Sequence, residues 1–202
     1  MTSMEPVKTR ANTLEGKALN AQGATRNDEK FLASLALALL ENPAATLQEL
    51  ARALGVSKAT LYRFCPTRDQ LVERLMEHAT RSLSQAIRSA ELGRDPPLEA
   101  LRRLTVKSLE NQELTLFLTF FWRPGASIEE QAYTDWMTAL DAFFLRGQQA
   151  GVFRIDISAA AMTELWISIL IGLQDAERRG RVARVGLPAL FELSFLHGTT
   201  QV

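Results

Sequence analysis

The side chains best suited to chemistry gather in one short stretch, residues 57–63. Its sequence, Ser-Lys-Ala-Thr-Leu-Tyr-Arg, combines two cations, three hydroxyl groups and one small side chain. If the stretch is helical and Leu61 faces inward, the outward side chains are Lys58, Ala59, Thr60, Tyr62 and Arg63. Lysine and arginine bind phosphates or guanine edges, and hydroxyl groups bind either. The stretch is therefore suited to contact nucleic acid, provided that neighbouring elements present it.

The elements around this stretch have the spacing of a helix-turn-helix. Thr46 and Glu49 form a capping box, T-x-x-E, that predicts a helix start at the next residue. Apolar residues then recur at helical spacing, at Leu47, Leu50, Ala51 and Leu54. Gly55 stands where a left-handed residue would end this helix, and Ser57 can cap the next one. The order predicts two short helices joined by a tight turn, the second of which would lie in the DNA major groove.

Local charge and a second capping signal favour the same interpretation. Glu49 is the one acidic residue among four basic ones, which are Arg52, Lys58, Arg63 and Arg68. The sequence Thr67-Arg68-Asp69-Gln70 is a T-x-x-Q box that predicts another helix directly after Pro66. A helix N-terminus has free N–H groups and a partial positive charge, which suits a backbone phosphate.

Residues 46–71 resemble the DNA-binding domain of the TetR (tetracycline-repressor-like) family of transcriptional regulators. The resemblance rests on the core Gly55-Val56-Ser57-Lys58-Ala59-Thr60-Leu61-Tyr62-Arg63-Phe64 and on the tail Pro66-Thr67-Arg68-Asp69-Gln70-Leu71. The chain departs from the family at Cys65, where an aromatic residue is usual, and at Arg68, where lysine is usual. The resemblance implies DNA contacts by Ser57, Lys58, Ala59, Thr60, Tyr62 and Arg63, with Thr46 and Arg68 on phosphates.

The rest of the sequence predicts an all-α fold. Of 202 residues, 47% are hydrophobic, glycine and proline are few, and alternating strand patterns are nearly absent. We expect further helices at 28–41, 68–92, 98–110, 113–122, 127–150, 159–177 and 187–196. The predicted parts are a mobile tail (1–26), a helix-turn-helix DNA-binding domain (27–80, motif about 46–65) and a helical effector-binding and dimerisation domain (81–202).

Two segments outside the motif bear on this organisation. The break Gly93-Arg94-Asp95-Pro96-Pro97 is the best candidate for a domain boundary in the chain. The tail carries basic residues that could touch DNA, although a solvated leader is the preferred interpretation; these are Lys8, Arg10, Lys17 and Arg26.

Composition argues against several other classes. The formal net charge is zero, which is compatible with DNA binding through one small face. The single cysteine, Cys65, cannot form an internal disulfide, and His78 and His197 are too far apart for a zinc motif. Gly-rich phosphate loops, nucleophile elbows and apolar runs of membrane-spanning length are all missing from the sequence. We therefore expect a cytoplasmic protein with no catalytic residues, metal site or cofactor.

A segment in the second half of the chain predicts a homodimer. Residues 166–173 are apolar on every side of a predicted helix, and Gly172 would allow close approach of another chain. Such a helix must be buried all round, either in a monomer core or against a partner. One recognition helix covers only a few base pairs, so two-fold pairing of subunits on a palindromic operator supplies the missing length and affinity. We therefore favour burial of this helix against a partner. In the family the last two long helices pair between subunits, and the expected interface here contains Leu165, Ile169, Leu170, Gly172, Leu173, Leu190, Phe191 and Phe195.

Aromatic residues concentrate in the same part of the chain. Ligand sites between bundle helices are mostly apolar, but aromatic residues at helical spacing also build ordinary core. The family resemblance implies a cavity for an apolar or aromatic small-molecule effector, which shifts the recognition helices and releases DNA. The candidate lining residues are Phe117, Phe120, Phe121, Trp122, Trp136, Phe143, Phe144, Met162 and Trp166.

These inferences favour a sequence-specific DNA-binding transcriptional regulator, a repressor that a small molecule releases from a double-stranded operator. Two other classes stay open. One is a helical protein-interaction module that keeps the fold without binding DNA, and the other is an all-α enzyme. Salt-dependent binding to DNA separates the regulator from the interaction module, and a turnover screen tests the enzyme.

Overall fold

The computed structural model describes residues 28–94, 96–122 and 127–200, apart from the side chains of residues 127–129. One of the sequence predictions therefore falls outside the described residues. It is the mobile tail at 1–26 with its basic side chains.

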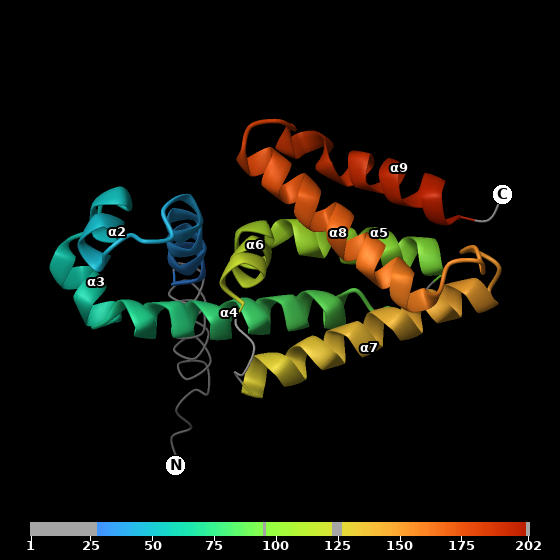
Figure 1. Cartoon of the computed structure of the whole chain (residues 1–202), viewed down its shortest axis with the longest axis horizontal. Helices are drawn as coiled ribbons and strands as arrows, with labels where there is room; N and C mark the ends of the chain where they lie inside the picture. The colour runs from blue at the N-terminus through green and yellow to red at the C-terminus, as the bar shows by residue number, and fades with distance from the viewer. Residues whose placement is uncertain (1–27, 95, 123–126, 201–202) are drawn as a thin grey trace, which may run out of the picture.

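The described residues fold almost entirely into helices, which confirms the all-α prediction (Figure 1). A helix at residues 28–41 precedes the elements labelled in the figure. These are α2 (Leu47–Ala53), α3 (Lys58–Phe64), α4 (Arg68–Ser89), α5 (Pro97–Glu110), α6 (Gln112–Phe121), α7 (Ser127–Gln149), α8 (Ala159–Arg178), the 3₁₀ turn η1 (Arg184–Gly186) and α9 (Leu187–Thr199). Most of the boundaries lie within one residue of those predicted.

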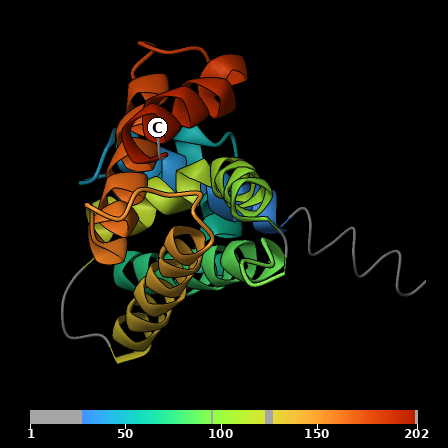
Figure 2. The same ribbon diagram turned by 90° about the vertical axis from the view of Figure 1, so that its right-hand side faces the viewer.

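The long helix α4 organises the arrangement of the others. The helix at 28–41, α2 and α3 lie around its N-terminal end, and α5 to α9 gather around its C-terminal half (Figure 1). In the view turned by 90°, α9 and α7 lie on opposite sides of the C-terminal bundle, with α8 between them (Figure 2). Helix α4 contacts α5, α6 and α7 directly. One helix therefore takes part in the packing at both ends of the molecule.

Local signals in the sequence explain the start of α2 and the turn after it. Thr46 and Glu49 form both halves of the predicted capping box. At the C-terminal end Gly55 has φ +66°, a conformation that glycine adopts without strain. The N–H of Gly55 donates to the carbonyl of Arg52 at 3.2 Å, and that of Val56 donates to the carbonyl of Ala51 at 3.0 Å. This is the Schellman pattern, and it turns the chain tightly into α3.

Helix α4 buries one apolar stripe along its length. It begins at the cap Thr67, whose hydroxyl accepts the N–H of Gln70. The buried apolar side chains that follow at helical spacing are Leu71, Leu75, Met76, Ala79, Ala86 and Ile87. The sequence predicted that α4 continues to about Leu92, but it ends at Ser89. Glu91 takes a positive φ of 49°, and this left-handed residue turns the chain away from the helix.

Hydrogen bonds from two arginine side chains join the two ends of α4 to the neighbouring helices α3 and α5. Near its start, Arg74 of α4 donates to the Phe64 carbonyl at 3.1 Å, and its guanidinium lies 3.9 Å from the centre of the Phe64 ring. Beyond its end, Arg103 of α5 donates through two nitrogens to the Ala90 carbonyl, at 2.9 and 3.2 Å. The recognition helix α3 and the C-terminal bundle are therefore both attached to the same helix.

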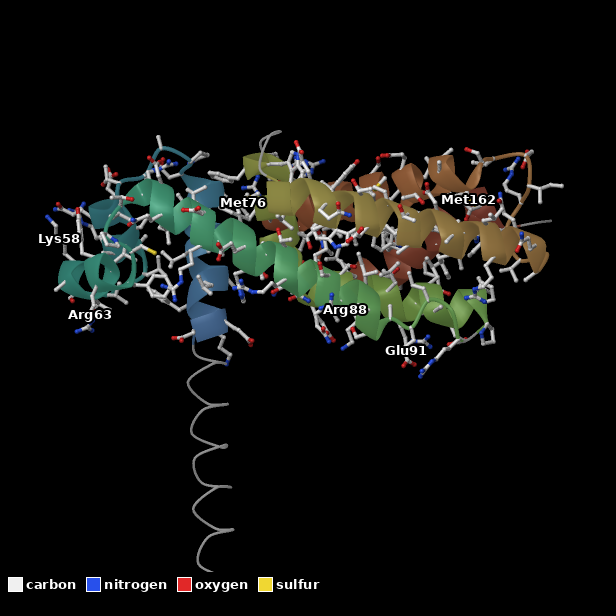
Figure 3. The ribbon with its side chains drawn as sticks, turned by 90° about the horizontal axis from the view of Figure 1, so that it is seen from below. Lys58, Arg63, Met76, Arg88, Glu91 and Met162 are labelled. Carbon is white, nitrogen blue, oxygen red and sulfur yellow. The ribbon has the colours of Figure 1, made fainter. Side chains whose placement is uncertain are left out.

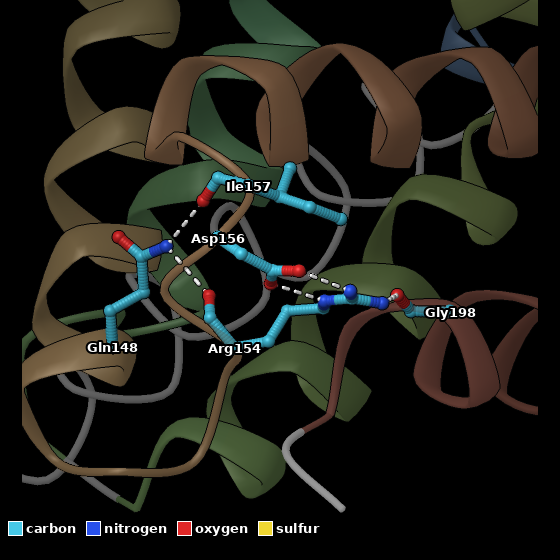
Figure 4. A network of polar contacts seen from close by, with 5 residues as sticks. All are labelled: Gln148, Arg154, Asp156, Ile157 and Gly198. Atoms are coloured by element: carbon cyan, nitrogen blue, oxygen red, sulfur yellow. Dashed lines mark hydrogen bonds and ion pairs between the residues drawn. The ribbon is translucent and has the colours of Figure 1, made fainter.

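The segment between α7 and α8, residues 150–158, closes the far end of the bundle and is called the strap below. Phe153 of this strap pairs with Thr200 in an isolated antiparallel bridge. Gln148 donates to the carbonyls of Arg154 and Ile157, at 2.8 and 2.6 Å (Figure 4). The Arg154 side chain pairs with Asp156 and reaches the Gly198 carbonyl at 3.2 Å. The Asp156 carboxyl has a lowered pKa because Arg154 donates to it.

The Phe153 ring is the hydrophobic anchor of this strap and is fully buried. It lies 5.5 Å from the Phe144 ring and 6.0 Å from the Phe143 ring, centre to centre. Its edge also covers Gly147 of α7, where an added Cβ would lie 2.2 Å from Cδ2 of the ring. Glycine is required at this position because the ring occupies the space of a side chain.

We predict that Gly147→Ala lowers the free energy of unfolding by about 1–3 kcal/mol, because the Phe153 ring must move out of a packed core. Urea denaturation followed by circular dichroism measures this change. The matched control is Gly198→Ala in α9, where an added Cβ meets no described atom within 4 Å. The control should be neutral or slightly stabilising, since alanine favours a helix. Equal midpoints for the two variants would contradict the role assigned to Phe153.

Candidate DNA interface and interior cavity

The outward face of α3 carries most of the residues expected to contact DNA. Lys58, Ala59 and Arg63 are exposed, and Tyr62 is 40% exposed. Lys58 and Arg63 project from the end of the molecule, away from the C-terminal bundle (Figure 3). The Lys58 ammonium lies 5.3 Å from the centre of the Tyr62 ring. The helix therefore presents cations and a phenol ring side by side on one open surface.

Burial on the opposite face holds α3 in this orientation. Leu61 is fully buried, and Ala51 and Cys65 are 3% and 2% exposed. Cys65 stands at the end of α3, where the family usually has an aromatic residue, and its thiol is packed in the core. The ring of Phe31, from the helix at 28–41, meets the edge of the Phe64 ring with centres 5.3 Å apart. The hydrophobic side of α3 thus fixes which side chains remain outside.

The hydroxyl groups of Ser57 and Thr46 lie at helix starts and remain exposed. Ser57 Oγ accepts the N–H of Thr60 at 3.0 Å and lies 2.7 Å from the Thr60 hydroxyl. Thr46 Oγ1 donates to the carboxylate of Glu49 at 2.8 Å, and its N–H donates to the same oxygen at 2.7 Å. These two hydrogen bonds hold the pKa of Glu49 below its usual value. Ser57 and Thr46 therefore order the two helices whose N-termini they cap.

Arg68 occupies a different environment from the other candidate residues. Its guanidinium donates to the carbonyl of Pro43, in the connection that precedes α2. The side chain is half-buried, whereas the resemblance implied a phosphate contact at the surface. In this structure Arg68 joins the start of α4 to the connection before α2. Sequence reasoning also missed Arg74, whose bond to Phe64 depends on a contact between two helices.

A cavity of about 340 Å³ lies between α4, α6, α7 and α8. All three tryptophans of the chain line it, and these were among the predicted residues. The other described lining residues are Leu83, Ile87, Thr115, Leu118, Thr119, Tyr133, Met137, Leu140, Ile167, Leu170 and Ile171. The cavity thus borders α4 at Leu83 and Ile87.

The remaining predicted pocket residues lie elsewhere. The core contains Phe117, Phe143, Phe144 and Met162, each with 2% exposure or less. Phe121 stacks on Phe117 with ring centres 4.5 Å apart, and Phe120 is 57% exposed. An aromatic residue at helical spacing can face the core, a cavity or solvent, and helix rotation decides which. Periodicity alone does not contain that rotation.

The polar groups of the cavity wall are mostly paired with the protein itself. The indole N–H of Trp136 donates to the Ser84 hydroxyl of α4 at 2.9 Å. That of Trp166 lies 3.4 Å from the Thr105 hydroxyl of α5. The Thr115 hydroxyl donates to the carbonyl of Asn111, the residue before α6, and the Thr119 hydroxyl donates to the carbonyl of Thr115. The surface offered to a ligand consists mainly of aromatic and aliphatic groups.

A second apolar surface lies along α8 and α9. Among the residues expected at a dimer interface, Leu165 is 41% exposed, Gly172 is exposed, and the half-buried ones are Ile169, Leu173 and Leu190. Leu193 of α9 is 56% exposed and was missed by sequence reasoning. Three others are buried within the protomer, namely Leu170, Phe191 and Phe195. Apolar side chains of α8 and α9 therefore remain accessible in the protomer, and the buried three pack inside the bundle.

No group of three or more His, Cys, Asp and Glu side chains among the described residues is arranged to hold a metal ion. None of the described helices combines the length and hydropathy needed to cross a bilayer. His78 lies half-buried in α4, and this burial, together with nearby Arg81, lowers its pKa.

Comparison with known proteins agrees with this geometry. Residues 34–75 match the model of the bacterial regulatory proteins of the tetR family. The chain is 50% identical over 180 residues to the HTH-type transcriptional regulator NfxB of Pseudomonas aeruginosa, an alignment that covers 86% of this chain and 95% of NfxB. It is 31% identical over 112 residues to the HTH-type transcriptional repressor LfrR of Mycolicibacterium smegmatis, covering 54% of this chain and 58% of LfrR.

Solved structures show the same fold. The TetR family regulator PfmR from Thermus thermophilus has a TM-score of 0.63 and 25% identity, covering 83% of this chain and 97% of PfmR. Residues 34–75, which match the family model, contain the capped helix-turn-helix with its exposed cations. The NfxB alignment covers 86% of the chain and therefore extends well into the C-terminal bundle. The chain therefore belongs to the TetR family of transcriptional regulators.

Proposed function

We propose that this regulator represses transcription by binding a palindromic DNA operator as a homodimer, and that a small molecule in the cavity releases it. The proposal rests on α4, which is joined to the recognition helix at Phe64 and borders the cavity at Leu83 and Ile87. LfrR is named a transcriptional repressor, and a structure of LfrR in complex with proflavine has a TM-score of 0.64 with this chain at 21% identity. That structure covers 90% of this chain and 99% of its own.

In this proposal residues 27–80 form the DNA-binding domain and residues 81–202 the effector and dimerisation domain, with α4 shared between them. Residues of α3 enter the major groove, where Lys58 and Arg63 contact phosphates or guanine edges and Tyr62 contacts bases. The caps Thr46 and Ser57 fix the helix starts near the phosphates. Arg68 acts by positioning α2 through Pro43. The protein works in the cytoplasm, where a bacterial operator is located.

We predict that Lys58→Ala and Tyr62→Ala each weaken operator binding by about 1–3 kcal/mol without lowering the melting temperature, because both side chains are exposed. Fluorescence anisotropy with an operator duplex selected from random sequence measures the affinity. Lys107→Ala on α5 is the matched control, because this lysine pairs with Glu110 far from α3. Unchanged operator affinity in both α3 variants would refute the assignment of this face.

Dimerisation is proposed through the open face of α8 and α9. Leu165 and Leu193 are large apolar side chains that water reaches in the protomer, and Gly172 lets a second backbone approach closely. Contiguous exposed apolar side chains mark interaction surfaces in soluble proteins. A second copy of the same face would cover them with two-fold symmetry, which matches the symmetry of a palindromic operator.

We predict that the double variant Leu165→Glu/Leu193→Glu is monomeric at micromolar concentration, because four carboxylates would have to be buried in one interface. Sedimentation velocity gives the mass of the native chain and the variant. Leu145→Glu on α7 is the control, since Leu145 is 49% exposed but lies outside the α8–α9 face. A monomeric native chain, or a double variant that stays dimeric, would reject this interface.

Release by an effector is proposed to pass through Trp136. Its ring lines the cavity, and its indole N–H holds Ser84 of α4. A ligand that displaces the ring therefore pulls on the helix that positions α3. Because α4 is attached to α5 through the Ala90 carbonyl, movement near Ser84 changes the angle of its N-terminal half. Binding energy in the cavity is thereby coupled to the geometry of the DNA-binding surface.

We predict that Ser84→Ala raises the ligand concentration needed for half-release of DNA, while affinity for the ligand without DNA changes little. The variant removes the acceptor that links Trp136 to α4 and so reduces the coupling free energy. Ligands found by a thermal-shift screen of apolar and aromatic compounds serve for both measurements. Ser82→Ala, on the same helix and outside the cavity lining, is the control and should release DNA normally. Identical release by both variants would exclude this route.

A further inference from the structure

We propose that the cavity selects uncharged, flat aromatic molecules and discriminates against both cations and anions of the same shape. This inference rests on the proposed effector role of the cavity and adds the class of ligand. It follows from three features of the described lining residues, which are their aromatic faces, the absence of charge among them and the pairing of their polar groups.

Four aromatic side chains shape the cavity. Trp136 and Trp166 are 9% and 3% exposed and form the deep part of the wall. Tyr133 is 47% exposed and its ring lies 5.7 Å from that of Trp122, which places this pair at the side open to solvent. Indole and phenol rings bind other aromatic rings by offset stacking or edge contacts. A planar fused ring system would enter past Tyr133 and lie against the two buried tryptophans.

The charge of the lining distinguishes between ligands of this shape. Among the described lining residues none has an ionisable side chain except Tyr133, whose phenol is neutral near pH 7. An ion that enters must lose water without gaining a partner of opposite charge, which is costly. Attraction between a cation and the tryptophan faces returns only part of that cost. An uncharged ligand avoids the cost and keeps the stacking.

Hydrogen bonding by the deep wall is also restricted. The indole N–H groups of Trp136 and Trp166 already point at Ser84 and Thr105. The hydroxyl groups of Thr115 and Thr119 already donate hydrogen bonds to backbone carbonyls. An anion would therefore find few donors in the deep part of the cavity. An apolar ring forms no hydrogen bonds with water, so it binds to this wall without losing any.

The three tryptophans of the chain all line this cavity, so tryptophan fluorescence of the full-length protein reports its occupancy directly. The probes share one skeleton. They are acridine, at a pH above the pKa of its ring nitrogen, the permanent cation N-methylacridinium, and the anion acridine-9-carboxylate. We expect acridine to quench the protein at a concentration at least about tenfold lower than either ion, because only the ions lose hydration without compensation. The cationic probe gives the most stringent test, because the proflavine in the LfrR structure is an acridine of the same shape that carries a positive charge near pH 7.

A variant with a charge in the lining tests the cause. Thr119 lines the cavity from α6 and is exposed at its surface, so a longer side chain fits there. Thr119→Glu should shift the preference toward N-methylacridinium, and Thr119→Gln, of the same shape without charge, should retain the preference for acridine. The same preference in both variants would show that charge does not govern selection and would overturn the inference.

The two levels of the proposal fail differently. If N-methylacridinium or the carboxylate quenches the native protein as well as acridine does, or if no probe quenches it, the inference on ligand class is wrong. Release of a selected operator duplex is measured separately by anisotropy. If acridine binds selectively and the duplex stays bound, the ligand class stands for this cavity and release by such ligands is rejected.

Discussion

The structure depends on one constraint, which is that α4 must pack along one continuous hydrophobic core, from the recognition helix to the C-terminal bundle. Its first half packs Leu71 and Leu75 into the core beneath the recognition helix, and its second half contributes Ile87 to the C-terminal bundle. Hydrogen bonds of two arginines join α4 to its neighbours. Arg74 of α4 donates to the Phe64 carbonyl at the end of α3, and Arg103 of α5 donates to the Ala90 carbonyl just after α4. Because a helix is stiff over this length, a displacement at one end is carried to the other.

Stability and signalling use different kinds of contact in this arrangement. The helix-turn-helix is held by caps and by a few small buried residues, so α3 keeps its shape while its outer side chains stay free for DNA. The far end of the bundle is closed by Phe153 and the strap around it. Between these two firm regions lies the cavity, where packing is incomplete and where one hydrogen bond, Trp136 to Ser84, links the wall to α4. Incomplete packing leaves the space that the proposed effector would occupy.

Electrostatics is arranged locally in a chain whose formal net charge is zero. The cations Lys58 and Arg63 lie on the exposed end of the molecule (Figure 3). Other charged residues form ion pairs at the surface, such as Arg102 with Glu192 between α5 and α9, and exposed pairs of this kind contribute little to stability. The described cavity lining contains no permanent charge. The chain thus presents cations on α3 and a described cavity lining without permanent charge, although its formal net charge is zero.

The sequence alone determined the helices, the helix-turn-helix and its exposed residues, because these depend on interactions between near neighbours. The Thr46–Glu49 box, the turn at Gly55 and the cap at Ser57 each act within a few residues, and Leu61 sets the buried side of α3. Only the tertiary structure decided which aromatic residues face the cavity, because that depends on how each helix is rotated against three others. It also gave Arg68 a partner at Pro43, 25 residues away, and left Leu193 uncovered while burying Phe191 two positions earlier. Such outcomes depend on the relative positions of distant segments, which hydrophobic periodicity does not specify.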